Sequence, residues 1–222
     1  MIEDEHIAAY LHSLDPVLPE PLYRLEKSAK EREIPIIRSS TQSLLRYLIR
    51  TLDPRDILEI GTAVGFSALF MRGCQREDGT VTTIEKVPAK IAEAKEHFKE
   101  LDPKGSIRLL EGDAAEVLAS LAGEGKCYDF VFLDAAKAQY PVYLAEIRKL
   151  LVPGGVLVSD NVLQDGTVAS SRYAVTRRDR TIHSRMREYL YELTHDDAFT
   201  TVILPVGDGV SVSTYHGQGE KV

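Results

Sequence analysis

The sequence predicts a doubly wound α/β fold, in which a mostly parallel sheet carries helices on both faces. From Arg55 onward, short apolar runs alternate with segments of helical periodicity, the pattern of parallel strands joined by crossover helices. One apolar run ends in Glu59 and is followed at once by Gly61 and Gly65, as where a strand turns into a helix over a ligand. With 222 residues, 44% of them hydrophobic, the chain can bury the core of one domain.

The first 52 residues are predicted to form a helical cover, followed by a core over 53–216, within a single domain of 1–222. Apolar residues recur at helical spacing at Ile7, Tyr10, Leu11 and Leu14. Further helices are expected over about 20–32 and 42–52, with prolines between the segments.

The core elements follow in alternation. Strands are predicted over 57–61, 80–85, 106–110, 130–134 and 156–160, and helices over 66–76, 88–101, 114–122 and 140–151. Gly154-Gly155 is expected to form a turn into the fifth strand. After a helix over about 180–195, the segments 200–205 and 210–215 predict an antiparallel hairpin joined through Gly207-Asp208-Gly209.

Composition excludes several classes of protein. A net charge of -7 argues against a protein that coats nucleic acid, although it leaves room for a local basic patch. Cys74 and Cys127 lack the spacing of a metal or redox site and are expected to be reduced. No apolar run approaches the length of a membrane span, and the acidic start Met1–Glu5 lacks the basic region of a signal peptide. We therefore expect a cytoplasmic protein with no membrane partner.

Polar side chains end two strands that should be neighbours in the sheet. Asp134 ends the fourth strand and Asp160-Asn161 end the fifth, so their oxygens can converge where ligands of such sheets bind. Two carboxylates and an amide would suit Mg²⁺, Mn²⁺ or Ca²⁺. Lys137 could orient or deprotonate a substrate hydroxyl there. The spacing equally allows two loop-capping aspartates and a solvated lysine.

Acidic residues also close the first strands, as expected around a bound adenosine moiety. Glu85 ends the second strand, where a carboxylate can accept a ribose diol, and Asp113 follows the third. The first loop does not match G-x-G-x-x-G.

Four ordered motifs carry a family resemblance. They are Leu58–Ser67, Phe132–Tyr140, Val158–Val162 and Leu204–Val210. They resemble the motifs of S-adenosylmethionine-dependent, metal-dependent O-methyltransferases of the caffeoyl-CoA and catechol type, over roughly residues 34–216. The resemblance implies a Rossmann-like, class I methyltransferase fold with a seven-stranded sheet, and a homodimer.

The family's site residues map onto positions of this chain. The metal ligands would be Asp134, Asp160 and Asn161. The catalytic residues would be Lys137 and Asp134. The cofactor contacts would be Ile36, Glu59, Gly61, Ser67, Glu85, Asp113, Ala114 and Asp134. One departure is Ala136, where plant members carry a second aspartate, so plant-type substrates become less expected while every ligand is kept.

Within the family, the sequence most resembles bacterial tRNA 5-hydroxyuridine methyltransferases, through Leu25–Ile36, Asp134–Tyr140, Asp160–Leu163 and Gly166–Ala169. The implied reaction is methylation of 5-hydroxyuridine at the tRNA wobble position, giving 5-methoxyuridine. That hydroxyl adjoins the O4 carbonyl, so both oxygens can chelate one metal ion, as those of a catechol do.

Six arginines lie within residues 172–187 against one acid, Asp179. We expect this basic segment to bind the backbone of a tRNA anticodon loop, while Tyr173 stacks on an unpaired base. The expected substrate and RNA contacts are Tyr140, Arg172, Tyr173, Arg177, Arg178 and Arg180. The same arginines could instead form a solvated helix face, pair with Glu188 and Glu192, or bind the phosphates of an acyl-CoA.

Two alternatives to tRNA methylation stay open at this point. The same chemistry could act on small catechol-like phenols or CoA thioesters. A non-catalytic cofactor-binding protein is the lesser alternative, because mere binding requires no lysine beside a metal site.

Overall fold

The computed structural model describes residues 4–217, so Met1–Glu3 of the acidic start lie outside the described residues. It divides into two compact units, one of Glu5–Val117 and one that follows from Leu118. The first unit holds α1 (Glu5–Ser13), α2 (Glu20–Glu31), α3 (Ser39–Leu52), β1 (Asp56–Ile60), α4 (Phe66–Cys74), β2 (Thr80–Glu85), α5 (Pro88–Leu101) and β3 (Ile107–Glu111). The junction lies in α6 (Ala114–Gly123). The second unit holds β4 (Tyr128–Leu133), η1 (Lys137–Gln139), α7 (Tyr140–Leu150), β5 (Leu151–Ser159), η2 (Gln164–Ala169), α8 (Arg180–His195), β6 (Phe199–Leu204) and β7 (Val210–Tyr215).

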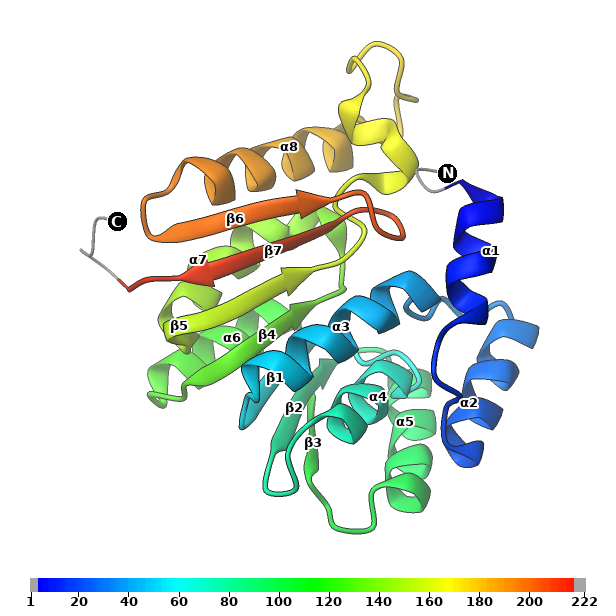
Figure 1. The fold of residues 1–222 in the computed structure, drawn as a ribbon. Helices are drawn as coiled ribbons and strands as arrows, with labels where there is room; N and C mark the ends of the chain where they lie inside the picture. The colour runs from blue at the N-terminus through cyan, green and yellow to red at the C-terminus, as the bar shows by residue number, and fades with distance from the viewer. Residues whose placement is uncertain (1–3, 218–222) are drawn as a thin grey trace. The chain divides into compact units, whose positions relative to one another are not determined.

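The strands form a seven-stranded sheet in the order β3-β2-β1-β4-β5-β7-β6 (Figure 1). In the first unit β1 pairs with β2 and β2 with β3, all parallel. In the second unit β4 and β5 are parallel, whereas β7 pairs antiparallel with both β5 and β6. The predicted fold class, including the C-terminal antiparallel hairpin, is therefore confirmed.

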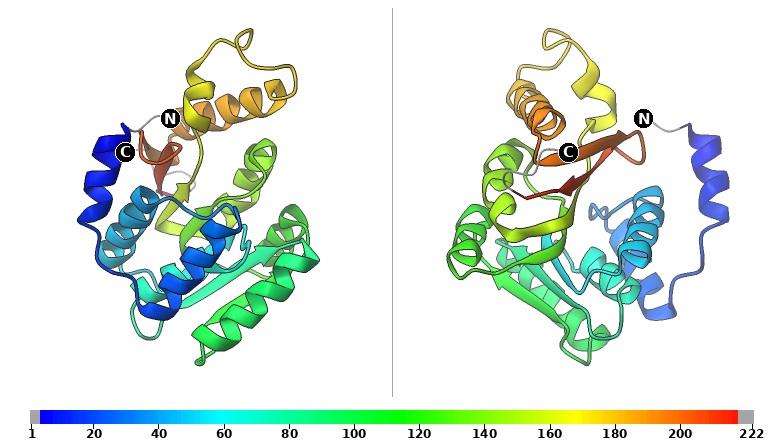
Figure 2. Two further views of the ribbon diagram at one scale, coloured as in Figure 1. Left: turned by 90° about the vertical axis from the view of Figure 1, so that its right-hand side faces the viewer. Right: turned by 60° about the vertical axis from the view of Figure 1, so that its left-hand side comes forward.

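Burial explains why the central strands are apolar without alternation. Ile57, Leu58 and Ile60 of β1 are fully buried, as are all residues from Phe130 to Leu133 of β4. A parallel strand with helices on both faces has no solvated side, so both of its faces must be apolar. In the second unit α8 packs against β6, α7 and η1, and η1 carries Lys137. Figure 2 shows α8 (orange) near the C-terminal strands in two further views.

The fifth strand begins earlier than the sequence predicts. Leu151 already pairs with Tyr128, but the register then shifts, and regular pairing resumes between Phe130 and Val156. Gly154 has a φ of +83°, so the expected turn is present as an irregularity within β5 rather than before it.

The turn from β1 into α4 requires a glycine at position 65. Gly65 has a φ of +87°, and a Cβ atom at this position would lie 2.7 Å from Cε1 of Phe98 on α5. Any larger residue would strain the backbone and displace the aromatic ring. The first motif of the sequence therefore reflects close packing in the first unit, whatever ligand binds beyond it.

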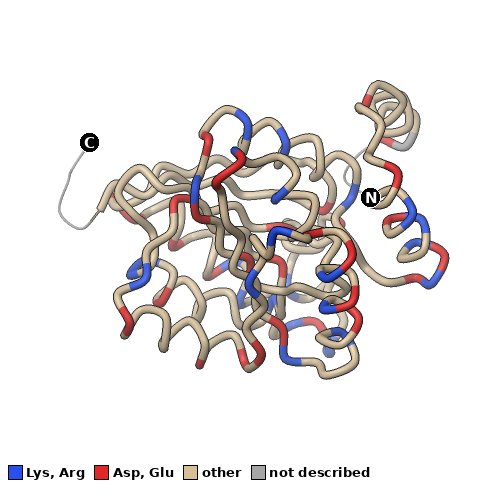
Figure 3. Tube along the Cα trace, turned by 90° about the horizontal axis from the view of Figure 1, so that it is seen from below, with Lys and Arg blue, Asp and Glu red and all other residues tan. Residues whose placement is uncertain are grey.

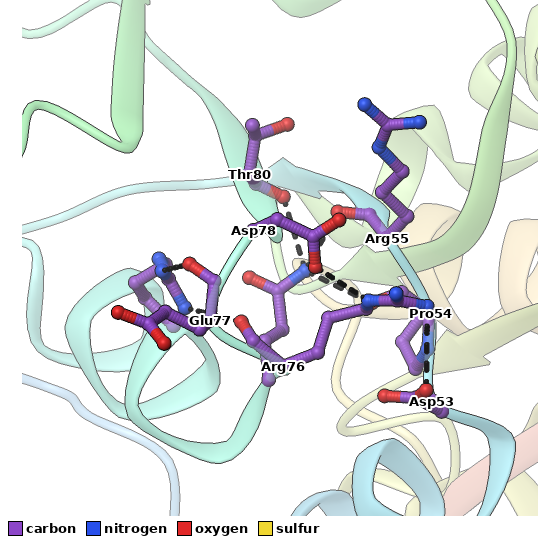
Figure 4. Close-up of polar contacts among 9 residues, drawn as sticks. Asp53, Pro54, Arg55, Arg76, Glu77, Asp78 and Thr80 are labelled. Atoms are coloured by element: carbon purple, nitrogen blue, oxygen red, sulfur yellow. Dashed lines mark hydrogen bonds and ion pairs between the residues drawn. The ribbon is translucent and has the colours of Figure 1, made fainter.

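Gln75, just after α4, ties together the N-terminal ends of β1 and β2. Its Nε2 atom donates to the carbonyl oxygens of Pro54, Arg55 and Thr80 at 3.1–3.3 Å. Outside it, the guanidinium of Arg76 binds the carboxylates of Asp78 and Asp53 (Figure 4). A buried amide thus donates to three carbonyls at the ends of these strands.

Lysines and arginines are interspersed with acidic residues along the chain (Figure 3). Within residues 4–217, no helix combines the length and the apolar character that crossing a membrane requires.

Candidate active site

The ends of β4 and β5 place Asp134 and Asp160 side by side. Leu133 and Ser159 are partners in the parallel register, so the next residue of each strand leaves the sheet at the same edge. The backbone N–H of Asp160 donates to the carbonyl of Leu133 at 3.0 Å, which extends the pairing by one step. Asn161 follows with a φ of +58°, a left-handed conformation that asparagine tolerates better than most residues.

Lys137 lies at the centre of these side chains. Its Nζ donates to Oδ1 of Asp134 at 2.7 Å, to Oδ1 of Asn161 at 2.7 Å and to the hydroxyl of Tyr140 at 3.0 Å. An ammonium has three hydrogens, so these contacts use its full donor capacity and fix its position. The structure therefore brings together the predicted metal ligands and the predicted catalytic lysine.

Tyr140 is fully buried and contacts Lys137 through its hydroxyl group. Its hydroxyl faces the carbonyls of Leu133 and Asp160, both at 3.1 Å, and its ring meets that of Tyr189 edge-on at 5.2 Å. Burial, followed by the charges of Asp134 and Asp160, raises the pKa of Tyr140 well above its usual value. The hydroxyl therefore stays protonated and can donate to these carbonyls. Its oxygen accepts from Lys137, so it does not face the solvent, where an RNA base would bind.

Asp160 is buried beside other acids. Desolvation and the charge of Asp134 raise its pKa to about 7, against the opposing effects of the Asn161 N–H and Lys137. The Asn161 N–H donates to Oδ1 of Asp160 at 2.8 Å. A carboxyl group in such surroundings gains from a nearby cation, which would favour its ionised form.

The donor set fits a hard divalent cation. Oδ1 of Asp134 and Oδ1 of Asn161 already converge on one positive charge, that of Lys137. Asp134 and Asp208 both raise the pKa of Asp160 electrostatically, whereas Lys137 lowers it. Among residues 4–217, no three His, Cys, Asp or Glu side chains are grouped so that they could hold a metal ion. An incomplete oxygen shell of this kind suits Mg²⁺, Mn²⁺ or Ca²⁺, with further positions for water and substrate.

Asp208 joins the site although sequence reasoning did not select it. Nδ2 of Asn161 donates to Oδ2 of Asp208 at 3.2 Å. The same turn binds the loop after β5, because the N–H groups of Val162 and Leu163 donate to the carbonyls of Gly209 and Asp208. The available signal was an acid flanked by two glycines inside a family-like motif.

The cofactor candidates Glu59 and Glu85 lie in the first unit, each in a hydrogen-bonded network. Glu59 is fully buried and accepts from the Thr83 hydroxyl at 2.5 Å. Because Thr83 donates there, its oxygen must accept from Thr62, which lies 2.6 Å away. Glu85 accepts three backbone N–H groups, from Ala63, Lys86 and Val87, at 2.9–3.0 Å. These bonds leave acceptor capacity on Oε2 of Glu85 for one hydroxyl.

The other cofactor candidates of the first unit lie outside these two hydrogen-bonded networks. Asp113 caps α6 by accepting from the N–H of Ala115 and pairs with Lys86 at 3.2 Å, and Ala114 begins the helix. Gly61 has a φ of +107° at the end of β1. Ser67 is half-buried in the first turn of α4, and Ile36 is half-buried ahead of α3.

The basic segment separates into two kinds of arginine. Arg185 pairs with Glu188, and Arg187 donates to the carbonyl of Val168, so the side chains of both are held by contacts within the protein. Arg172, Arg177 and Arg178 are exposed, and within residues 4–217 no hydrogen bond or ion pair holds their side chains. Tyr173 is 90% exposed, while Arg180 is half-buried at the start of α8.

A family model described as O-methyltransferase matches residues 12–215. This chain belongs to the O-methyltransferase family. A protein of Mycolicibacterium vanbaalenii, provisionally named an O-methyltransferase, is 35% identical over 188 residues, which cover 82% of this chain and 80% of that one. The family prediction is therefore confirmed at this level.

Solved structures of other O-methyltransferases share the fold. A Staphylococcus aureus structure, provisionally described as a caffeoyl-CoA O-methyltransferase, has a TM-score of 0.85 at 30% identity and covers 95% of this chain and all of its own. The O-methyltransferase TomG of Streptomyces achromogenes, involved in tomaymycin synthesis and solved with S-adenosylmethionine, has a TM-score of 0.83 at 26% identity, with 96% of each chain covered.

Proposed function

We propose that this O-methyltransferase transfers the methyl group of S-adenosylmethionine to the 5-hydroxyl of 5-hydroxyuridine at the tRNA wobble position, in a reaction that depends on a divalent cation. The observation that carries the proposal is the position of Lys137. Its Nζ is held by Asp134, Asn161 and Tyr140, so a group that can orient a substrate hydroxyl, and as the neutral amine accept its proton, stands among the oxygens that would hold the cation. Crystals of the similar protein TomG contain S-adenosylmethionine, which supports the choice of cofactor.

The residues of the site divide the chemical work. Asp134, Asp160 and Asn161 would hold the cation, and Glu59, Glu85 and Asp113 would hold the cofactor. Bound S-adenosylmethionine would supply an electrophilic methyl group, and a bound divalent cation would lower the pKa of a hydroxyl that it contacts. Lys137 orients the substrate oxygen and holds or accepts its proton at Nζ, while Tyr140 keeps Lys137 in place.

The tRNA part of the proposal rests on the basic segment. Arg172, Arg177 and Arg178 are exposed and lack partners among the described residues, so their guanidinium groups are available to phosphate oxygens. Tyr173 presents an exposed ring on which an unpaired base could stack.

Small catechol-like phenols or CoA thioesters are the second candidate substrates. The Staphylococcus aureus protein, with its high structural similarity, is named after caffeoyl-CoA, and exposed arginines can also bind the phosphates of CoA. In this case the same residues would methylate a phenol whose two adjacent oxygens chelate the cation.

The deciding experiment is methyl transfer from labelled S-adenosylmethionine, with Mg²⁺ or with EDTA. The acceptors are tRNA from cells that lack this enzyme, a catechol panel and a caffeoyl-CoA-type thioester. We expect label in tRNA nucleosides that EDTA abolishes. Label confined to the small acceptors would transfer the enzyme to the second candidate class, and label that resists EDTA would contradict metal dependence.

Substitution of Lys137 tests the role of this residue. Lys137→Ala should lower turnover on the order of 10²–10⁴-fold, because the substrate hydroxyl loses the group that orients it and takes part in its deprotonation. Lys149→Ala is the matched control, since among residues 4–217 this lysine pairs only with Glu146 of its own helix, and the variant should keep full activity. Turnover rates are measured at saturating cofactor. If both variants matched the wild type, the proposed role of Lys137 would be contradicted.

A further inference from the structure

We infer that Asp208 is a positioning residue, which fixes the side-chain amide of Asn161 so that its oxygen faces the metal site. The inference rests on the proposed metal dependence of the enzyme. It concerns the turn between β6 and β7, 47 residues away in the sequence from the amide that it contacts.

Two neighbours of opposite hydrogen-bonding character define the orientation of this amide. On one side, Lys137 Nζ can only donate, so it requires the oxygen of Asn161, at 2.7 Å. On the other side, the ionised carboxylate of Asp208 can only accept, so it requires the Nδ2 group, at 3.2 Å. A flipped amide would place a donor against the ammonium and an acceptor against the carboxylate. Only one orientation therefore satisfies both neighbours.

When a cation replaces Lys137 as the partner of the oxygen, Asp208 alone still defines the orientation. Asn161 is half-buried and has left-handed backbone geometry, so its side chain leaves the strand end with no partner from β5 itself. The carboxylate supplies a charge-assisted hydrogen bond to this side chain. It also polarises the amide, which increases the negative character of the oxygen that would meet the metal.

Backbone hydrogen bonds of the turn hold Asp208 in place beside Asn161. The carbonyl of Asp208 accepts from the N–H groups of Leu163 and Gln164, and that of Gly209 accepts from Val162. Gly209 has a φ of +86°, and any Cβ there would overlap the Leu163 side chain. The loop after β5 and the hairpin turn are thus held in register, and Asp208 is the side chain that projects from the turn to Asn161.

The test measures Mn²⁺ binding by electron paramagnetic resonance, in the full-length protein without cofactor or substrate. Asp208→Ala should weaken Mn²⁺ binding about tenfold or more, as losses of groups that orient a metal ligand generally do. Asp208→Asn can still accept from Nδ2 but can also pair with a flipped amide, so it should weaken binding about threefold. Asp197→Ala removes an acid of the same unit that makes none of these contacts, and it should bind Mn²⁺ as the wild type does.

A double-mutant cycle separates orientation from simple charge. In an Asn161→Ala background, Asp208→Ala should have almost no further effect on Mn²⁺ affinity, because the amide that it positions is gone. Equal losses in both backgrounds would overturn the positioning role and leave only a long-range charge effect. Asp208→Asn, close in shape to the wild type, decides the question if Asp208→Ala fails to fold.

Two outcomes distinguish this inference from the proposed function. If the wild type binds Mn²⁺ and both Asp208 variants bind it equally well, the positioning role is overturned while metal dependence stands. If the wild type binds no divalent cation, metal dependence and the positioning role fail together. Cofactor affinity, measured by calorimetry, should stay within about twofold in every Asp208 variant, since the expected loss lies in metal binding.

Discussion

At the scale of single residues, Asp160 is a buried carboxyl group whose surroundings disfavour its ionised form. It is 3% exposed, and Asp134 and Asp208 both raise its pKa. The Asn161 N–H and Lys137 compensate only in part, and the pKa stays at about 7. Ionising a carboxyl group in such surroundings costs free energy unless it binds a cation.

Asp160→Ala should therefore abolish turnover and divalent-cation binding, because the cation loses one of two protein carboxylates. The affinity for S-adenosylmethionine should stay within a few fold, since Asp160 is not itself among the expected cofactor contacts. Steady-state rates and calorimetric titration with the cofactor check the two halves. Unchanged activity in this variant would remove the metal assignment.

Sequence reasoning could find Asp134, Lys137, Asp160 and Asn161 because each follows directly from a strand end. The carboxyl ends of neighbouring parallel strands meet at one edge of a sheet, so their polar residues are expected to converge. Asp208 could not be found this way, because its contact depends on the antiparallel insertion of β7 beside β5. Periodicity along one segment carries no information about that register.

At the scale of elements, the regular helices and strands were predictable, whereas short irregular turns were not. The apolar runs predicted the ends of all five of these strands to within two residues, except the start of β5, which lies five residues earlier than expected. The elements η1 and η2 escaped prediction, because three to six residues are too few to show a helical period. The early start of β5 was also missed, since a single pair, Leu151 with Tyr128, extends the strand.

The amide of Gln75 provides a stability test of one such connection. Gln75→Ala should lower the free energy of unfolding by about 1–3 kcal/mol, because it removes a buried amide that donates to the carbonyls of Pro54, Arg55 and Thr80. Arg76→Ala breaks exposed ion pairs and should cost much less than Gln75→Ala. Urea unfolding measures both. Equal costs would show that the surface pairs, not the amide, secure the turn.

The contact between α7 and α8 gives a pH test. Arg148 binds both Glu192 and Asp196, and the N–H of Ala198 donates to Asp196 at 2.8 Å. Burial tends to raise the pKa of Asp196, but the bonds from Ala198 and Arg148 outweigh it and lower the pKa below its usual value. The ionised carboxylate therefore stabilises the fold above its ordinary pKa, near 3.9, and this stabilisation disappears as the pH falls through the lowered value.

Asp196→Asn should accordingly be less stable than the wild type near neutral pH, and the difference should shrink as the pH falls below about 4. Urea titrations across this range measure it. Asp197→Asn, which lacks these contacts, is the control and should show no shrinking difference. A gap for Asp196→Asn that is independent of pH would mean that packing, not charge, is lost.

At the scale of the whole molecule, the basic segment should decide between large and small substrates. Replacing Arg177 and Arg178 by alanine should raise the KM for tRNA and leave activity on a small catechol unchanged. If each arginine contacts one phosphate, the slope of log affinity against log salt should fall by roughly 1.4–1.8. Arg185→Ala is the matched control, because that arginine is already paired with Glu188. Equal loss on both substrates would make the two arginines structural.

The organisation of the molecule as a single domain of 1–222, its homodimeric state and its cytoplasmic location stay predictions. Composition and family resemblance suggested them, but neither the fold nor the candidate site depends on them. Size measurement in solution would test the dimer directly.

The position of β7 between β5 and β6 has a consequence for the making of this protein. A ribosome produces β5, then β6, and only afterwards the strand that must lie between them. Until then β5 presents a bare edge to other nascent chains, and the loop that carries Asn161 lacks the hairpin turn that holds it. The enzyme would thus acquire its metal-site geometry as one of the last events of its own synthesis.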